Sequence, residues 1–433
     1  MTESPQKNTF RIAHGSKTKY ALAIVVAALL LGSFFLCLAT QNGDLNRWMG
    51  IDYVPNSNAS RGEVTSGEPV NSSVWQGIAA NAWAYFQPGV GVNSNTGLPY
   101  ASGTNFEAFT SWDLGVYIQA IIDAQKLGLV GVDGAWGSNA RIEKVMNFLM
   151  NRPLNASTGY PFWYYDGTNG KDYYALSDKA SAVDISDTGR LFDALYNLKE
   201  YNSSLAASID YLVYNQSDYA ALLPNVEADA SSNNIYAYYI DSGFASFWPQ
   251  QVGDIPNKIA ANIAASPCLT TYGVSLPNAT LTSEPLLCSV FELASNQEIN
   301  QLMWQVYQAH EGYYNATGKY AAFSEGNSFG SQYLYEWIVA PNNGGTWKIG
   351  TTTPNVYLNM DPIAYTKVAY SFLAIYNSSF AQNLVVHLEK TIPKPTDGYS
   401  DGADSSGQCV PGAGCNTNGL ILDAVVYALQ SST

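Results

Sequence analysis

Four acidic side chains of this sequence stand beside a glycine or an aromatic residue, or where a helix is expected to start. Asp113 lies in SWD, Asp187 in SDTGR, Glu325 in SEG and Glu336 in YEW. The hydrolysis of a glycosidic bond needs two carboxyl groups, a protonated one as general acid and a second that activates water or attacks the sugar. Burial against an adjacent tryptophan would raise the pKa of such a group toward the value that a general acid requires. The four residues are therefore candidate catalytic groups.

Each candidate also has a structural interpretation. Asp113 and Asp187 suit the first turn of a helix, where the dipole favours an anion, and the arginine of SDTGR can pair with Asp187. Glu336 falls in a predicted helix and can pair with a base such as Lys348, while Glu325 sits in a glycine-flanked loop whose backbone amides it can bind. We expect Glu325 to act as general acid and Asp113 as general base of an inverting reaction, with their carboxyl groups roughly 6.5–9.5 Å apart.

Aromatic residues would supply the rest of a sugar site, because the face of an aromatic ring complements the C–H face of a pyranose. They make up 13% of the chain, and the cluster FWYYD at 162–166 stands in a loop, where packing requirements are lower. For any single aromatic residue, packing in the core between helices is the alternative role. The candidates for stacking on a sugar are Trp112, Trp163, Tyr164, Trp248 and Trp337.

Other chemistries have little support in the sequence. His310 and Glu311 begin like the zinc motif HExxH, but Tyr314 stands where the second histidine should be. The run DGYSDGADSSGQ contains three aspartates whose spacing departs from that of a calcium loop, so a polar turn is the simpler interpretation. The sequence has no GxSxG, no phosphate-binding loop and no Cys/His catalytic pair. We expect neither a metal nor a cofactor.

Helices must position these groups. Apolar residues recur at helical spacing from Leu114 to Leu127, and Ser111 before them is a typical N-cap residue. Strand-like alternation is scarce and short. An all-α fold follows, an (α/α)6 toroid of six helical hairpins in a ring with long aromatic loops. The predicted helices span 74–86, 112–128, 137–150, 185–201, 203–213, 235–247, 295–310, 330–338, 361–376, 379–389 and 417–430.

The N-terminal region predicts a membrane anchor. Residues 20–40 carry no charge and are almost wholly apolar, which is long enough to span a bilayer as a helix. The tail before them, residues 1–19, is basic, so the positive-inside rule puts it in the cytoplasm. A cleaved signal peptide is the alternative. Residues 41–72, rich in Asn, Ser, Gly and Pro, are typical of an extracellular linker, and residues 73–433 would form the toroid domain.

Two further patterns agree with a location outside the cell. Eight N-x-Ser/Thr sequons suggest a glycoprotein; they lie at Asn58, Asn71, Asn155, Asn202, Asn215, Asn278, Asn315 and Asn377. Four of the five cysteines follow the apolar segment, an even number that suits an oxidising compartment. Cys268 with Cys288 and Cys409 with Cys415 would close short disulfide loops, although spacing alone leaves the other pairings open.

The charge balance excludes one class of partner. The chain has a formal net charge of −15, while only 13% of its residues are charged and 31 are tyrosines. A lysine-poor, acidic surface argues against nucleic acid as a partner. Because such a surface changes little when carboxylates become protonated, we hypothesise an organism that lives in acid, and a stability profile that peaks sharply at neutral pH would count against this.

Four segments of the sequence resemble one known family. WAYF, TGLP and TSWDLGVYIQAIIDAQKLGLV, between residues 83 and 130, are similar to the opening of a domain of unknown function numbered 3131. DTGRLFDALYNLKEY at 187–201, FSEGNSFGSQYLYEWIV at 323–339 and CNTNGLILDAVVYAL at 415–429 follow in the expected order. Members of this family look like glucoamylase-type (α/α) toroids. The resemblance therefore implies a toroid fold for this chain. The sequence departs from the family pattern around Cys268 and Cys288.

The leading hypothesis is a membrane-anchored extracellular glycoside hydrolase with a carbohydrate substrate. The alternative is a non-catalytic protein of the cell envelope that binds a glycan or other cell-surface proteins, because a fold does not fix a function. Two or more acids in one aromatic cleft would favour the enzyme. A cleft lined by amides and a single acid would favour the binding protein.

Overall fold

The computed structural model describes residues 64–68, 70–103, 106–173, 184–329, 332–341, 345–353 and 356–430. The predicted tail, the predicted anchor, most of the predicted linker and Asn58 lie outside these residues. Among the residues that are described, no helix is both long and apolar enough to cross a membrane.

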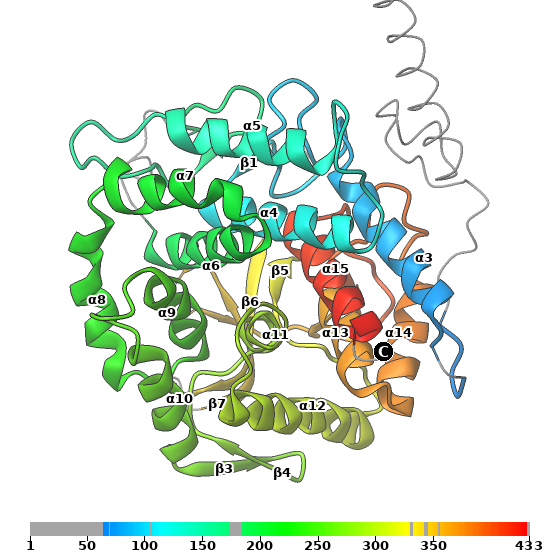
Figure 1. Cartoon of the computed structure of the whole chain (residues 1–433). Coiled ribbons are helices and arrows are strands. Elements are labelled where there is room, and N and C mark those ends of the chain that lie inside the picture. Colours follow the sequence, from blue (N-terminus) through cyan, green and yellow to red (C-terminus); the bar gives the residue numbers. More distant parts are fainter. Residues whose placement is uncertain are drawn as a thin grey trace, which may run out of the picture.

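Six helices of the described chain form an inner ring (Figure 1). Each packs on the next along the ring, and the last closes it by packing on the first. Every residue of α4 from Ser111 to Ala124 is buried, as expected for a helix that is covered on all sides. The inner helices are α4 (Ser111–Lys126), α6 (Ile185–Tyr201), α9 (Ile235–Phe247), α11 (Ser283–Glu292), α13 (Thr366–Tyr376) and α15 (Cys415–Gln430).

An outer layer of helices surrounds this ring, and along the chain outer and inner helices alternate. The helix-rich toroid predicted from the sequence is therefore present. Its outer helices are α3 (Ser72–Trp83), α5 (Ser138–Asn151), α7 (Ala206–Tyr211), α8 (Leu223–Ala228), α10 (Ile255–Ala265), α12 (Gln297–Thr317) and α14 (Ser379–Thr391). Single turns of other helix types stand at Ala84–Phe86, Ser203–Leu205, Leu212–Gln216, Tyr219–Leu222 and Asp229–Ser231.

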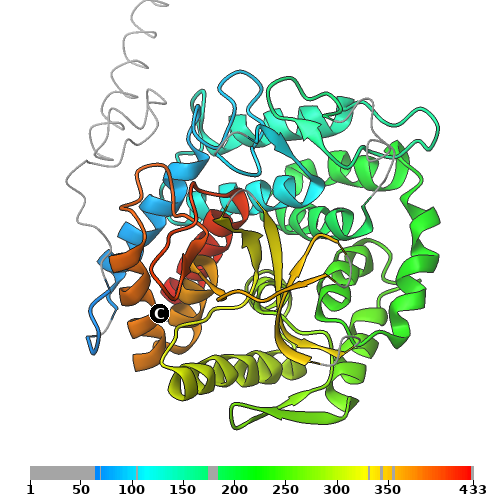
Figure 2. The ribbon, with the colours of Figure 1, turned by 180° about the vertical axis from the view of Figure 1, so that it is seen from behind.

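The all-α prediction is wrong in one region, because a four-stranded antiparallel sheet stands between α12 and α13. Seen from behind, it lies in front of the inner helices near the centre of the ring (Figure 2). Its strands are β5 (Glu325–Asn327), β6 (Tyr333–Ala340), β7 (Gly345–Thr351) and β8 (Tyr357–Leu358). Short antiparallel pairs join β1 (Ala108–Phe109) to β2 (Tyr165–Asp166), β3 (Cys268–Thr271) to β4 (Val274–Pro277) and β9 (Ile363–Tyr365) to β10 (Gly402–Asp404).

Strand β6 replaces the helix predicted at 330–338. Its aromatic and β-branched residues suit a strand, and it gains hydrogen-bonded partners on both sides, β5 and β7. Leu334, Glu336 and Ile338 are buried, whereas the alternating Tyr333, Tyr335 and Trp337 are partly exposed. One face of β6 therefore carries three aromatic rings, and the other face carries Glu336 into the core.

The four cysteines after the apolar segment are free thiols, which contradicts the predicted disulfides. Cys268 is exposed at the start of the β3–β4 hairpin, which projects from the edge of the molecule, while Cys288 is buried in α11 (Figure 1). The Sγ atom of Cys415 lies 3.5 Å from the backbone oxygen of Asp113. The Sγ atom of Cys409 lies 3.3 Å from Oγ of Ser400. Cys409 and Cys415 therefore contact different residues and are not bonded to each other.

The sequon asparagines in the described residues all stand at the surface. Asn71, Asn215, Asn278, Asn315 and Asn377 are exposed, and Asn155 and Asn202 are partly exposed. Glycosylation of these positions is sterically possible and stays a prediction.

Candidate active site

The N-terminal ends of the inner helices bring polar side chains together at one mouth of the ring. Outer and inner helices alternate in direction around a toroid of hairpins, so all inner helices start at the same end. The residues that meet there come from six helices: Asp113 of α4, Asp187 of α6, Tyr236 of α9, Glu284 of α11, Lys367 of α13 and Asn416 of α15. Sequence segments far apart thus build one site.

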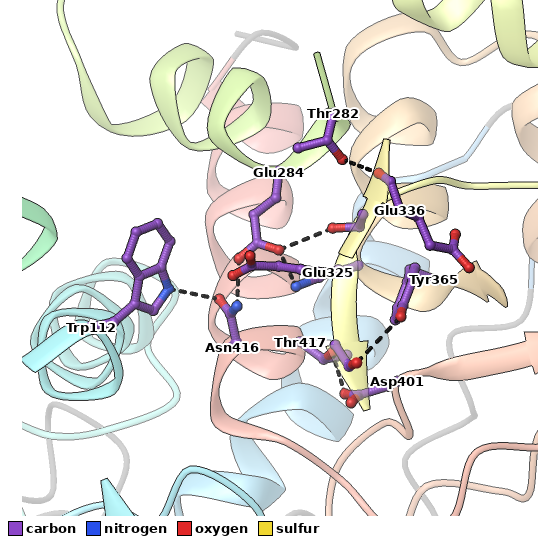
Figure 3. A network of polar contacts seen from close by, with 12 residues as sticks. Trp112, Thr282, Glu284, Glu325, Glu336, Tyr365, Asp401, Asn416 and Thr417 are labelled. Carbon is purple, nitrogen blue, oxygen red and sulfur yellow. Dashed lines mark hydrogen bonds and ion pairs between the residues drawn. The ribbon is translucent and has the colours of Figure 1, made fainter. Parts of the chain in front are cut away.

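Glu284 lies at the centre of this group and was missed by the sequence analysis. Its carboxylate forms a buried ion pair with Lys367, accepts a hydrogen bond from Ser324 at 3.0 Å and accepts another from the side-chain amide of Asn416 (Figure 3). The indole N–H of Trp112 lies 3.5 Å from the amide oxygen of Asn416. A continuous polar chain therefore joins α4, α15, α11, α13 and the start of β5. The only sequence signal for Glu284 is its position in the first turn of α11, and that helix was not predicted.

Glu325, the first residue of β5, points toward the Glu284 carboxylate (Figure 3). It is 7% exposed, accepts a 2.5 Å hydrogen bond from the hydroxyl of Tyr236 and accepts a 3.1 Å bond from the hydroxyl of Tyr333. Burial, followed by the Glu284 charge, raises the pKa of Glu325 to about 7, while Lys367 and the two hydroxyls act in the opposite direction. Glu325 is thus poised to hold or release a proton near neutral pH.

Asp401 fixes the strand that carries Glu325. One of its oxygens accepts hydrogen bonds from the backbone N–H and the side-chain amide of Asn327, at 3.0 and 2.9 Å. The other accepts a 2.6 Å bond from Thr417 of α15. Asp401 is therefore a positioning residue between β5 and α15.

Asp113 has its predicted structural role in the first turn of a helix, and it also lies at the mouth of the ring. Its Oδ2 accepts a 2.9 Å hydrogen bond from the backbone N–H of Thr110, and the two residues form a capping box at the start of α4. It also belongs to the mouth of the ring, because Glu284 and Lys367 both act on its charge. Burial is the largest cause that raises the pKa of Asp113 to about 6, against the lowering effect of the Thr110 hydrogen bonds.

Asp187 lies beside Asp113, in the first turn of α6. The hydroxyl of Thr110 hydrogen-bonds its carboxyl group, and its Oδ2 is buried without a hydrogen-bond partner. Burial, then Asp184, Asp113 and Glu325, raise its pKa well above the ordinary value. The predicted pairing with Arg190 is wrong, because that guanidinium binds Glu292 instead, at 2.8 Å.

A shallow surface depression, too narrow to enclose a water-sized volume, connects Asp187 to the aromatic loop. Trp163 and Phe162 line one side of it, and Asp184, Asp187 and Ser111 line another. These two residues of the loop at 162–166 therefore lie beside Asp187, and their stacking on a sugar stays a prediction.

Glu336 does not share this site. It is 1% exposed on the core face of β6, and its Oε1 accepts a 2.8 Å hydrogen bond from the backbone N–H of Ile363. Burial raises its pKa well above the ordinary value. The expected helical pairing with Lys348 is wrong, because Lys348 stands opposite Trp337 in the sheet and Glu336 stands opposite Ile349.

Four of the five predicted aromatic residues lie near Glu325 or Asp187, and Trp248 does not. Trp337 meets Tyr236 at 5.8 Å between ring centroids, and Tyr236 meets Trp112 at 6.4 Å. Trp163 packs beside Tyr164 at 5.0 Å. Trp248, by contrast, follows the C-terminal end of α9 and packs on Phe192 and Phe244 in the core, at the opposite end of the ring from the carboxylates.

The residues considered as metal ligands have structural roles in the described chain. His310 is fully buried, its Nδ1 lies 2.8 Å from the backbone oxygen of Val306, and its Nε2 accepts a 3.0 Å bond from the N–H of Phe323. Burial lowers the pKa of His310 to about 4, so it is a neutral ring. Within the described residues, no group of three His, Cys, Asp or Glu side chains could hold a metal ion.

The sequence matches one family model over most of its length. A family model described as "Protein of unknown function (DUF3131)" matches residues 77–232 and 263–431. The chain belongs to this family. Among curated proteins, none matches the sequence.

Solved structures support the toroid fold at low sequence identity. A glucoamylase-like protein from Bacteroides caccae shares 15% identity with a TM-score of 0.60, and the match covers 83% of this chain and 94% of that one. An endo-β-1,2-glucanase from Chitinophaga pinensis, in complex with sophorotriose and glucose, shares 13% with a TM-score of 0.58, covering 83% and 93%. One from Talaromyces funiculosus, in complex with sophorose, shares 11% with a TM-score of 0.56, covering 83% and 85%.

Proposed function

We propose that this protein is a glycoside hydrolase that acts at the mouth of the inner ring. The observation that carries the proposal is the convergence of Glu325, Asp113 and Asp187 beside Trp163, Tyr236 and Trp337. Several acids in one aromatic site are the arrangement that distinguishes a hydrolase from a glycan-binding protein.

Glu325 is the general acid in this proposal and Asp113 the general base. Their pKa values, about 7 and about 6, leave Asp113 ionised at a pH where Glu325 still holds a proton. Burial also raises the pKa of Asp187 well above its ordinary value, and its position beside Asp113 fits a role in binding a sugar hydroxyl. An inverting reaction requires roughly 6.5–9.5 Å between the two catalytic carboxyl groups, so that water fits beside the base.

The substrate is a neutral glycan, and a glucan is the first choice. Among the described residues at the mouth, the cation is Lys367, which is already paired with Glu284, while Asp113 is ionised, so an anionic substrate would find no free positive charge. Two of the similar solved structures are endo-β-1,2-glucanases, which makes β-1,2-glucan the first glucan to examine.

The proposal includes a location outside the cell, with residues 20–40 as the anchor and the sequons glycosylated. It is supported by the basic tail, the apolar segment and the surface position of the described sequon asparagines. Protease added to intact cells should then remove the domain, while a chain whose residues 1–40 are replaced by a cleavable signal peptide should appear in the medium.

The experiment that tests the function compares the purified full-length protein with a Glu325→Gln variant. Both are incubated from pH 2 to 7 with β-1,2-glucan, other β-glucans, α-glucans and envelope glycans, and the reducing sugar released is measured. Glu227→Gln, an exposed substitution on the outer helix α8, is the matched control. Sugar released by the wild type and the control, but not by Glu325→Gln, supports the proposal. Glycan retained on all three proteins without hydrolysis would favour the non-catalytic alternative.

A further inference from the structure

A second hollow, of about 570 Å³, opens on the loops that precede α4 and follow α5, and we call it the distal hollow. The Asn93–Asn95 turn, Tyr100 and Ser102 line one part of it, and Glu107, Asp166 and Tyr173 line another. It is separate from the carboxylates already described, because none of its lining residues belongs to the mouth of the ring.

The chemistry of the distal hollow suits a neutral, polyhydroxylated ligand. Its described lining offers amide, hydroxyl and carboxylate groups that accept and donate hydrogen bonds, together with tyrosine rings. No lysine or arginine is among these lining residues, which argues against a phosphate or another anion.

Part of the distal hollow is held in place before any ligand binds. The side-chain oxygen of Asn93 accepts hydrogen bonds from the N–H groups of Asn95 and Thr96, both at 2.9 Å, and its amide donates to the hydroxyl of Tyr100 at 2.8 Å. The carboxylate of Asp166 accepts a 2.8 Å bond from the N–H of Thr168. A pre-organised polar surface loses less entropy when it binds a ligand.

A row of aromatic rings leads from the distal hollow to the mouth of the ring. Tyr173 meets Phe106 at 5.4 Å between centroids, and Phe106 meets Tyr164 at 5.8 Å. Tyr164 meets Trp163 at 5.0 Å, and Trp163 lines the shallow surface depression that also borders Asp187. The row therefore ends beside Asp187, at the mouth of the ring.

Chain connectivity bounds the length of this path. Glu107 of the distal hollow precedes β1, and β1 runs directly into Thr110 and Asp113. Asp113 is the sixth residue after Glu107, so the two backbones are no more than about 20 Å apart. A chain of several sugar units can therefore occupy both places at once.

We propose that the distal hollow is a second binding site for the same neutral glycan, so that the substrate is a polymer or long oligosaccharide bound along the aromatic row. This inference rests on the proposed function for the identity of the ligand. It adds that binding depends on chain length, which a site confined to the mouth of the ring would not show.

The test measures binding by calorimetry in the full-length Glu325→Gln protein, so that no ligand is consumed. The probes are three polymers, β-1,2-glucan, β-1,3-glucan and α-1,4-glucan, and the trisaccharide of each. Tyr173→Ala and Asn95→Ala are made in this background, with Tyr211→Ala as the control, because Tyr211 is also an exposed tyrosine and lies on the outer helix α7. Tyr173→Ala should weaken binding of the polymer roughly three- to tenfold, as expected for a lost aromatic contact, and leave the trisaccharide unchanged.

The outcomes separate this inference from the proposed function. Equal binding of the polymer by both variants and by the control overturns the second site, whatever the hydrolysis assay shows. So does equal weakening of polymer and trisaccharide, and so does the failure of all three polymers to bind. Polymer binding that depends on Tyr173, without any hydrolysis by the wild type, supports the second site and overturns the proposed hydrolase.

Discussion

Two buried clusters of ionisable side chains lie inside the ring, one at its mouth and one deeper. The mouth cluster consists of Asp113, Asp187, Glu284, Glu325 and Lys367, at the N-terminal ends of the inner helices. The deep cluster consists of Arg190, Asp193, Tyr239, Asp241, Glu292 and Asp423, farther along the same helices. Each contains several acids and a single cation, so their composition is similar.

Access distinguishes the two clusters. Arg190 binds Glu292 with both terminal nitrogens, at 2.8 and 2.9 Å, and the hydroxyl of Tyr239 donates to the same carboxylate at 2.7 Å. Asp193 is buried beside them, and neither of its carboxyl oxygens has a hydrogen-bond partner. The deep cluster is buried inside the ring, with Asp241 near Asp229 of the outer layer, whereas the mouth cluster borders a shallow surface depression and a row of partly exposed aromatic rings.

Similar residues therefore have different roles in the two clusters, because their surroundings differ. In the mouth cluster, Lys367 binds Glu284, and Glu325 is left with two tyrosine hydroxyls and a pKa of about 7. In the deep cluster, the acids can only contribute to stability, because no substrate reaches them. Catalysis should therefore depend on the first cluster and the pH dependence of folding on the second.

The largest effect is expected for Glu325→Gln. This variant should lose about 10²–10⁴-fold in glycan hydrolysis, the usual contribution of a general acid, while its melting temperature stays close to that of the wild type. Activity and thermal unfolding are measured on the same preparation. A comparable loss of activity per folded molecule in Glu292→Gln would remove the distinction between the clusters.

Glu292→Gln should instead destabilise the fold. The substitution leaves the Arg190 guanidinium buried without its counter-charge, and breaking such a pair costs about 3–5 kcal/mol of unfolding free energy. Urea denaturation measures this. A double Arg190→Met and Glu292→Met variant, which removes both charges, should recover much of the loss; a double variant as unstable as Glu292→Gln would argue against the ion pair as the cause.

Stability should fall as pH rises, and Asp241→Asn should reduce this dependence. Burial, followed by the Asp229 charge, raises the pKa of Asp241 to about 8, and Asp193 lies beside it. The folded chain then holds a proton that the unfolded chain releases near pH 4, so this contribution is complete below about pH 4 and is lost between about pH 4 and 8. Urea midpoints for both proteins at pH 4, 6 and 8 measure it. Asp241→Asn should match the wild type at pH 4 and exceed it at pH 8, by at most about 5 kcal/mol, since one pKa unit corresponds to about 1.4 kcal/mol.

The smallest effect is expected for Tyr236→Phe, as a shift in the pH profile of hydrolysis. Activity should fall below about pH 6 as Asp113 becomes protonated and above about pH 7 as Glu325 loses its proton. The Tyr236 hydroxyl lowers the pKa of Glu325, so its removal should move the alkaline limb upward by up to about one pH unit, because a hydrogen bond contributes about 1 kcal/mol. Tyr239→Phe, which removes the corresponding hydroxyl of the deep cluster, should leave the profile unchanged; a shift there would contradict the assignment.

Local sequence signals determined much of the ring. Ser111 as N-cap, Asp113 in the first turn and the apolar pattern after them predicted α4, whose N-cap is in fact Thr110, one residue earlier. The predicted helices 185–201, 235–247 and 417–430 lie close to the observed bounds of α6, α9 and α15. Helix caps and periodicity depend on residues within one or two turns of each other, which is why a sequence reveals them. The same positions brought Asp113 and Asp187 to the start of inner helices and hence to the mouth.

Helix caps and periodicity do not indicate which distant segments of the chain contact each other. The segment YLYEWIVA suits a helix or a strand by composition, and only pairing with β5 and β7 decides for a strand. That choice turns Glu336 into the core and places Tyr335 opposite Glu325. The helices α10 and α11 were missed as well, and Glu284 with them.

Local sequence signals thus predicted a helix-rich toroid and placed Asp113 and Asp187 at the mouth, because helix starts are encoded locally, whereas Glu325 was chosen from its glycine-flanked loop. Only the tertiary structure decided their chemistry. Lys367 is 83 residues from Glu284, and Tyr236 is 89 residues from Glu325, yet these neighbours set which carboxylate is paired and which can hold a proton. A pKa depends on burial and on nearby charges, and both are properties of the packed ring.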